Sequence, residues 1–109
     1  MKKIILITML MSAVFAQSDC NENNWQDYYN SDGKDMSDCD LRGANLTNAE
    51  LSFANLRGAN LTDADLTYAN LRRAYLTNAN LTDAELRLAN LTDAELRLAN
   101  FTNAYLINA

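Results

Sequence analysis

The sequence predicts an all-β solenoid, a chain wound into stacked coils, and two regularities point to this class. From position 41 onward a leucine falls on every fifth residue, with one replacement by phenylalanine. A small residue stands two positions before each of these residues, first a cysteine and then always an alanine. A period of five fits neither the 3.6-residue turn of a helix nor the two-residue alternation of a strand. The repeat is therefore expected to be the structural unit itself.

Each repeat is expected to form one side of a coil. The small residue and the leucine are two positions apart, so both point to the same side of a short strand. The next two residues are polar or turn-prone, as in Arg42-Gly43 and Thr62-Asp63, and can turn the chain before the next unit. Coils stacked about 4.8 Å apart would join the leucines into a filled column along the axis. The central residues are Leu41, Leu46, Leu51, Leu56, Leu61, Leu66, Leu71, Leu76, Leu81, Leu86, Leu91, Leu96, Phe101 and Leu106.

This pattern resembles the pentapeptide-repeat family, whose consensus is roughly A-[DN]-L-x-x, over residues 39–109. Asn or an acidic residue precedes the central residue in twelve of the fourteen units, and Tyr75 and Tyr105 depart from the pattern. The resemblance implies a right-handed, four-sided parallel β-helix with four units per coil. Fourteen units then make about 3.5 coils, a rod roughly 17 Å tall at strand spacing.

The first sixteen residues have the pattern of a secretory signal peptide. Lys2 and Lys3 precede an apolar run from Ile4 to Phe15, and Val14-Phe15-Ala16 suits cleavage before Gln17. The run is short for a membrane span, so an uncleaved anchor is the less favoured alternative. We expect an exported protein, periplasmic or extracellular, with residues 1–16 removed.

Residues 17–38 are expected to cap the first coil. Trp25, Tyr28 and Tyr29 lie within five residues and would share one side of a short helix between positions 21 and 30. Cys20 and Cys39 are the only cysteines, and an even count in a small exported chain favours a disulfide over two free thiols. Closing that loop would contribute roughly 3 kcal/mol.

Composition excludes several classes of function. The formal net charge is −5, or −7 once Lys2 and Lys3 are removed, and no basic patch suggests nucleic-acid binding. The chain has no histidine, the commonest general base and metal ligand. We expect no catalytic residues, no cofactor and no metal ligands, and hence no enzyme.

The outward positions offer two candidate surfaces. Three columns would stack on one face: Asn60, Asn80 and Asn100; Thr62, Thr82 and Thr102; and Asp63, Asp83 and Asn103. They suggest a cation-binding carboxylate ladder or a flat ice-binding threonine face. The bland alternative is that these side chains bond to neighbouring backbone at the corners. Scattered apolar residues also point outward and form a candidate interaction strip: Phe53, Tyr68, Leu88 and Leu98.

The chain stops at Ala109 in the middle of a unit, and no polar segment follows the last coil. An open coil exposes apolar side chains and unpaired backbone groups. We therefore predict an end-to-end homodimer that buries Phe101, Tyr105, Leu106 and Ile107. A truncated gene product is the competing interpretation.

Three functions remain. The favoured one is an exported, non-catalytic structural or protein-interaction scaffold with an unidentified protein partner. Some members of the family are acidic DNA mimics that bind bacterial type II topoisomerases such as gyrase, and the acidic composition fits that alternative. An ice-binding or cation-binding surface is the minor alternative.

Overall fold

The computed structural model describes residues 19–109. The predicted signal peptide, residues 1–16, lies outside this range. Within residues 19–109 no helix is long and apolar enough to cross a membrane.

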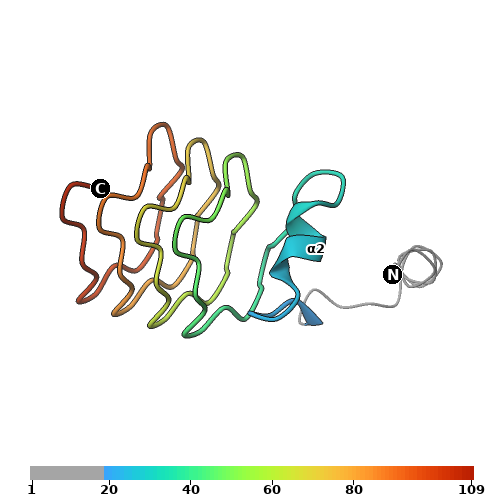
Figure 1. Ribbon diagram of the computed structural model, residues 1–109, viewed down its shortest axis with the longest axis horizontal. Coiled ribbons are helices and arrows are strands. Elements are labelled where there is room, and N and C mark those ends of the chain that lie inside the picture. Colours follow the sequence, from blue (N-terminus) through green and yellow to red (C-terminus); the bar gives the residue numbers. More distant parts are fainter. Residues whose placement is uncertain (1–18) are drawn as a thin grey trace.

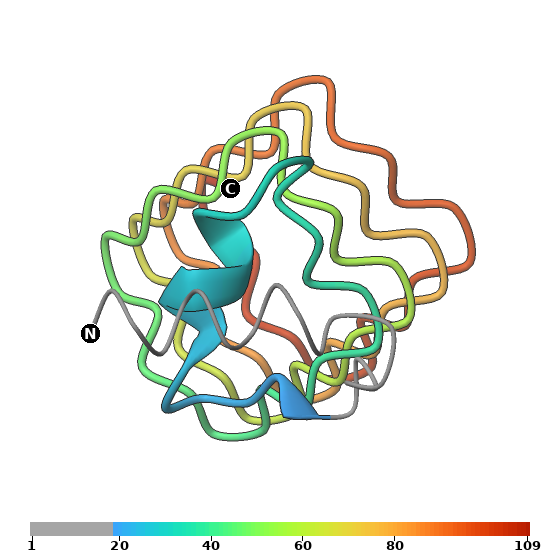
Figure 2. The same ribbon diagram turned by 90° about the vertical axis from the view of Figure 1, so that its right-hand side faces the viewer.

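The described chain returns to the same position every twenty residues. Single-residue parallel bridges join each outward residue to the one twenty positions later, from Asp35–Asn55 to Glu85–Tyr105. The repeated coils stack along one axis, and the view down that axis shows their four-sided outline (Figures 1 and 2). We number the faces by their central residues: face 1 holds 41, 61, 81 and 101; face 2 holds 46, 66, 86 and 106; face 3 holds 51, 71 and 91; face 4 holds 36, 56, 76 and 96.

Each coil is hydrogen-bonded to the next by the same set of contacts at every side. The amide of Leu41 donates to the carbonyl of Asn60, at 2.8 Å, and the amide of Asn60 donates back to the carbonyl of Cys39, at 2.9 Å. The amide of Gly43 donates to the carbonyl of Thr62 at 2.9 Å. Along the sides of the coils the backbone is therefore satisfied by the neighbouring coils, as a parallel solenoid requires.

The corners are tight turns with a left-handed residue. The amide of Ala44 donates to the carbonyl of Leu41 at 3.1 Å, which closes a four-residue turn, and Gly43 has a φ of +64°. A positive φ at the third turn position is typical of a type II turn. The residue two after each later central residue has a φ near +60° as well, even where it is Phe53 or Leu88. We call these positions the corner residues.

Leucine and alanine fill the axis. The central leucines from Leu41 to Leu86 are at most 1% exposed, and the alanines between them are buried apart from the half-buried Ala49. Removing this apolar area from water supplies the main driving force for stacking. A close-packed column of this kind leaves no room for a ligand on the axis.

The repeat begins one unit earlier than the leucine pattern indicates. Met36 is fully buried beneath the leucine column, and Asp35 pairs with Asn55. The corner residue Asp38 has a φ of +57°, like its successors. Methionine replaces leucine in this unit and Lys34 replaces alanine, so the five-residue pattern did not reveal it.

Helix α2, Trp25–Tyr29, lies at the N-terminal end of the stack (Figure 1). Trp25, Tyr28 and Tyr29 pack against the core, and the Tyr29 hydroxyl donates to the carbonyl of Ser52 at 3.2 Å. Burial is the main cause that raises the pKa of Tyr28, and the negative charges of Asp19 and Asp27 add to it. The helix falls within the segment 21–30 that its aromatic spacing indicated.

The disulfide between Cys20 and Cys39 is present, and it continues the alanine column. Both cysteines are fully buried, and their Cα atoms lie 4.8 Å apart, which is the spacing between neighbouring strands of a sheet. Cys39 occupies the alanine position of the first unit on face 1, and Cys20 stacks below it. The bond thereby ties the segment containing α2 to the first coil.

Candidate functional site

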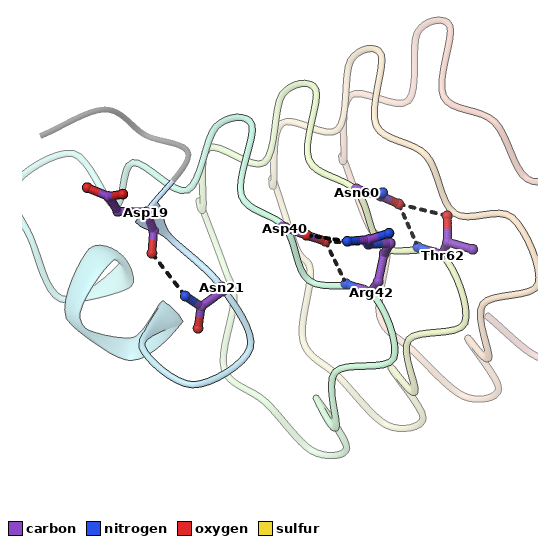
Figure 3. Close-up of polar contacts among 6 residues, drawn as sticks. All are labelled: Asp19, Asn21, Asp40, Arg42, Asn60 and Thr62. Carbon is purple, nitrogen blue, oxygen red and sulfur yellow. Dashed lines mark hydrogen bonds and ion pairs between the residues drawn. The ribbon is translucent and has the colours of Figure 1, made fainter.

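The asparagine and threonine columns of face 1 are bonded within their own turns. The hydroxyl of Thr62 donates to the Oδ1 atom of Asn60 at 2.7 Å, and the amide of Thr62 donates to the same oxygen at 3.2 Å (Figure 3). Asn80–Thr82 and Asn100–Thr102 repeat this arrangement. These hydroxyl hydrogens are engaged by the protein, which supports the structural interpretation of the columns over an ice-binding face.

The same turn contact explains why Asn or Asp precedes most central residues. Its side-chain oxygen accepts the amide two residues later, for example from Thr47 to Asn45 at 3.1 Å and from Arg72 to Asn70 at 3.1 Å. This bond pre-forms the corner that follows. Among residues 19–109 no three of His, Cys, Asp and Glu gather as a metal-binding group.

Three carboxylates have lowered pKa values because they accept hydrogen bonds. The Arg42 guanidinium donates to Asp40 at 2.8 and 2.7 Å and lowers the pKa of that carboxyl (Figure 3). Side-chain hydrogen bonds from Ser52 and then Asn70 lower the pKa of Glu50. Thr67, through its hydroxyl and then its amide, lowers the pKa of Asp65. These carboxylates therefore stabilise the turns that follow them, by accepting hydrogen bonds from the residue two positions later.

The predicted apolar strip is divided among three corners. Tyr68 and Leu88, which are 57% and 45% exposed, stack on the corner of face 2. Phe53 lies on the corner of face 3 and Leu98 on the corner of face 4. The register therefore brings together only Tyr68 and Leu88 of the four.

The last coil is open at the end away from α2 (Figure 1). Tyr105 is 56% exposed, Leu106 43% and Ile107 61%, and Phe101 is half-buried. Within residues 19–109 the amides of Leu91, Phe101 and Leu106 have no acceptor, whereas their counterparts in earlier coils each donate to the next coil. The four residues predicted for a dimer contact thus belong to one open end, and an open depression of about 540 Å³ beside it is lined by residues 88–92, Asn108 and Ala109.

A cationic group on faces 3 and 4 was not found by sequence reasoning. The Arg57 guanidinium lies over the Tyr75 ring at 4.3 Å, and Arg73 lies over Phe53 at 5.7 Å. We call this group the arginine corner, although it covers the two turns that border face 4, and define it as Phe53, Arg57, Arg72, Arg73, Tyr75 and Arg97. Phe53, Arg72 and Arg73 lie in the turns after face 3, and Arg57 and Arg97 lie in the turns after face 4. Its members come from three successive coils, and sequence spacings of twenty and forty residues were the available signal.

A stack of four-sided coils around a filled axis defines this protein as a parallel β-helix, a class that presents its outer surface rather than an interior pocket. The model of the family described as pentapeptide repeats, in eight copies, matches residues 35–63, 54–93 and 69–108. The chain therefore belongs to the pentapeptide-repeat family, as its sequence predicted. Membership implies the right-handed, four-sided form of the helix and a generally structural, non-catalytic role.

Several solved structures are similar to this chain. Rfr23, a pentapeptide repeat protein from the cyanobacterium Cyanothece 51142, is 38% identical with a TM-score of 0.65, over 65% of this chain and 48% of Rfr23. HetL from the cyanobacterium Nostoc sp. strain PCC 7120 is 39% identical with a TM-score of 0.57, over 69% of this chain and 37% of HetL. A pentapeptide repeat protein of the Arabidopsis thaliana thylakoid lumen is 26% identical with a TM-score of 0.62, over 84% of this chain and 70% of that one.

The chain thus spans about half of Rfr23 and about a third of HetL. The comparison with curated proteins found no match.

Proposed function

We propose that this protein is an exported, non-catalytic scaffold that binds another protein through the outer faces of its coils. The observation that carries the proposal is the division of the molecule into a filled axis and exposed, chemically varied corners. The central leucines leave no ligand space, whereas Tyr68, Leu98 and the arginine corner are open to contact. One similar protein, HetL, is described as involved in heterocyst differentiation regulation, a role that fits recognition.

Export is supported by three independent features. Residues 1–16 have the composition of a signal peptide, and Cys20 and Cys39 form a disulfide, which persists in oxidising compartments. One of the similar structures comes from a protein of the thylakoid lumen.

Mass spectrometry of the chain expressed with its first sixteen residues tests export. We expect a mature protein beginning at Gln17 in the periplasm or medium, with both cysteines protected from thiol reagents until reduction. The matched control lacks residues 2–16 and should stay in the cytoplasm with reactive thiols after unfolding. Cytoplasmic retention of the full chain, with free thiols, would contradict the proposal.

We further propose that α2 caps the first coil and leaves the opposite end for self-association. The aromatic side chains of α2 and the disulfide cover the N-terminal end of the stack. Within residues 19–109 the opposite end exposes apolar area at Phe101, Tyr105, Leu106 and Ile107. Two copies meeting there would bury these side chains about a two-fold axis.

Sedimentation velocity over a range of protein concentrations tests this contact. The wild type should form a dimer, and Leu106→Asp should remain monomeric because it places a charge in the contact. Leu98→Asp is the matched control, since Leu98 is 74% exposed on the side of the same coil. A wild type that stays monomeric at the highest concentration would refute the dimer.

The acidic DNA mimic remains the alternative function. Asp63 and Asp83 stack on the corner of face 1 and favour it, because regularly spaced carboxylates resemble backbone phosphates. The arginine corner and the export pattern argue against it. Supercoiling by purified gyrase with added protein decides this alternative, and unchanged activity at a large molar excess rules it out.

A further inference from the structure

The arginines of this chain are unevenly distributed around the rod. Four of the six belong to the arginine corner, on faces 3 and 4, although the chain carries a net charge of −5. Arg72 and Arg73 are consecutive, and Arg57 and Arg97 stand in one column two coils apart. At strand spacing that column separation is about 10 Å. Lys34 adds a fifth positive charge on these faces, and their five carboxylates balance the sum: Asp35, Asp38, Glu50, Asp93 and Glu95. The positive charge is therefore concentrated locally, at the turns that carry the four arginines.

The two remaining arginines are neutralised within their own strands. Arg42 makes a two-pronged contact with Asp40, and Arg87 lies 3.4 Å from Glu85. Arg57 and Arg73 face carboxylates of a different coil at a longer 3.6 Å, in half-exposed pairs. Exposed pairs of this kind contribute little free energy, so a competing carboxylate can displace them.

The side chains of Arg72 and Arg97 have no partner among residues 19–109. Both residues are exposed. Their guanidinium donors are therefore available to an external anion at no loss of internal contacts.

Stacking holds two of the guanidinium groups in place. The Arg57 group lies over Tyr75 and also donates from its Nη1 atom to Asn55 at 3.2 Å. A guanidinium stacked by its flat face keeps its in-plane N–H donors free for a carboxylate. Prior ordering lowers the entropy cost of binding.

Phe53 supports the corner at a conformational cost. It has a φ of +62° and is 44% exposed, in a position where most other five-residue units carry Gly, Asn or Asp. A bulky residue kept in a strained and exposed position suggests a role beyond folding. Here its ring lies beneath Arg73.

We propose that the arginine corner is the docking surface for an extended acidic segment of a partner protein. This inference rests on the proposed scaffold function and names the chemistry of its partner. Alternate side chains of an extended segment lie on one side about 7 Å apart, so successive carboxylates can reach neighbouring guanidinium groups in paired hydrogen bonds. Asp93 and Glu95 border the corner, and with the acidic remainder of the molecule they disfavour a long uniform polyanion such as duplex nucleic acid.

Fluorescence anisotropy with a labelled eight-residue glutamate peptide tests the docking surface on the full mature chain. We expect saturable binding at low ionic strength that weakens steeply as salt shortens the range of the attraction. Arg72→Gln and Arg97→Gln should each weaken binding by about three- to fivefold, and the double variant by at least about tenfold. Neither side chain makes a hydrogen bond or ion pair within residues 19–109, so both variants should keep the wild-type circular dichroism spectrum.

Arg42→Gln and Arg87→Gln are the matched controls on faces 1 and 2 and should weaken binding by less than about twofold. Equal losses in the controls, or no saturable binding by the wild type, would overturn the inference. Tighter binding of polygalacturonate or of a duplex oligonucleotide than of the peptide would also overturn it, in favour of a sugar or nucleic-acid partner. Export and self-association do not involve these arginines. If the peptide does not bind, the proposed scaffold function is therefore still tested separately by the mass spectrometry and sedimentation experiments.

Discussion

Residues 81–90 and 91–100 have the identical sequence L-T-D-A-E-L-R-L-A-N but different surroundings. Ten residues are half a coil, so the two copies occupy opposite sides of the rod. Leu86 is fully buried whereas the matching Leu96 is 37% exposed, and Leu88 is 45% exposed whereas Leu98 is 74% exposed. Residues 101–109 cover the first copy, and no described residue covers the second.

The neighbours beneath the two copies differ as well. Glu85 pairs with Asp65 in the coil below, whereas Glu95 pairs with Tyr75 and lies 3.6 Å from Arg57. The comparison teaches that in this fold the environment of a residue is decided by the residues twenty positions before and after it. The local sequence contributes only the direction in which each side chain points.

Removing a central leucine is the strongest test of this contrast. Leu86→Ala should lower the free energy of unfolding by about 3 kcal/mol, because it leaves a cavity in the covered column. Leu96→Ala should cost only about 1 kcal/mol, because part of that side chain is already in water. Urea denaturation at low protein concentration measures both. Equal costs would show that Leu96 is covered in solution, and a cost of Leu96→Ala that rises with protein concentration would support the proposed dimer.

Replacing the corner leucines by asparagine should relieve backbone strain but remove packing contacts, and these two effects change the stability in opposite directions. Leu88 and Leu98 have φ values of +59° and +58°, which asparagine adopts at lower cost than leucine. Leu98→Asn should stabilise the protein by about 0.5 kcal/mol, since the exposed side chain loses little packing. Leu88→Asn should change stability by less, because the lost contacts offset the relief of strain. Thermal melting compares the two variants, and a destabilised Leu98→Asn would contradict the strain argument.

Low pH should destabilise the coil next to the first decapeptide copy, where Asp65 pairs with Glu85. Bonds from Thr67 hold the pKa of Asp65 below its ordinary 3.8, so the carboxylate stabilises the fold at neutral pH. That stabilisation is lost as the pH falls below about 4 through the folded-state pKa. Asp65→Asn should flatten the decline of the melting temperature below pH 4, by the equivalent of under about 1 kcal/mol for this half-buried site that solvent still reaches.

A second variant, Thr67→Val, tests the same contact from the other side. It removes the hydroxyl donor and should also reduce the dependence of the melting temperature on acid. Asparagine accepts the same bonds at Asn60, so Asp65→Asn should fold normally at neutral pH. An acid profile unchanged by both substitutions would exclude this carboxylate as a contributor.

The smallest difference is expected at the two matched arginines. Arg87→Gln loses an exposed ion pair with Glu85 and should cost about 0.3 kcal/mol. Arg97→Gln should leave stability unchanged, because its side chain has no partner within residues 19–109, while it weakens binding of the acidic peptide. Denaturation and anisotropy on the same preparations separate these effects. A larger stability loss for Arg97→Gln would mean that it makes a structural contact in solution.

Much of the fold could be predicted because the repeat is nearly unbroken. The leucine period marks the buried column, and the cysteine count indicated the bond between Cys20 and Cys39. Met36 was missed because neither it nor Lys34 matches the repeat, although the backbone of that unit follows the same path. The arginine corner was missed because Arg57 contacts residues one and two coils away, and its contacts depend on how the side chain turns once the coils are stacked.

The sequence alone determined the solenoid, its axis of leucine and alanine, and the stacking of Tyr68 beneath Leu88. These follow from period and side-chain direction, which are local properties of the backbone. Only the tertiary structure decided that Cys20 extends the alanine column, that the threonine hydroxyls turn toward asparagine, and that Arg57 and Arg73 each lie over an aromatic ring. Those contacts depend on burial and on distances between coils. Because two identical decapeptides have different surroundings, such contacts cannot be predicted from the local sequence.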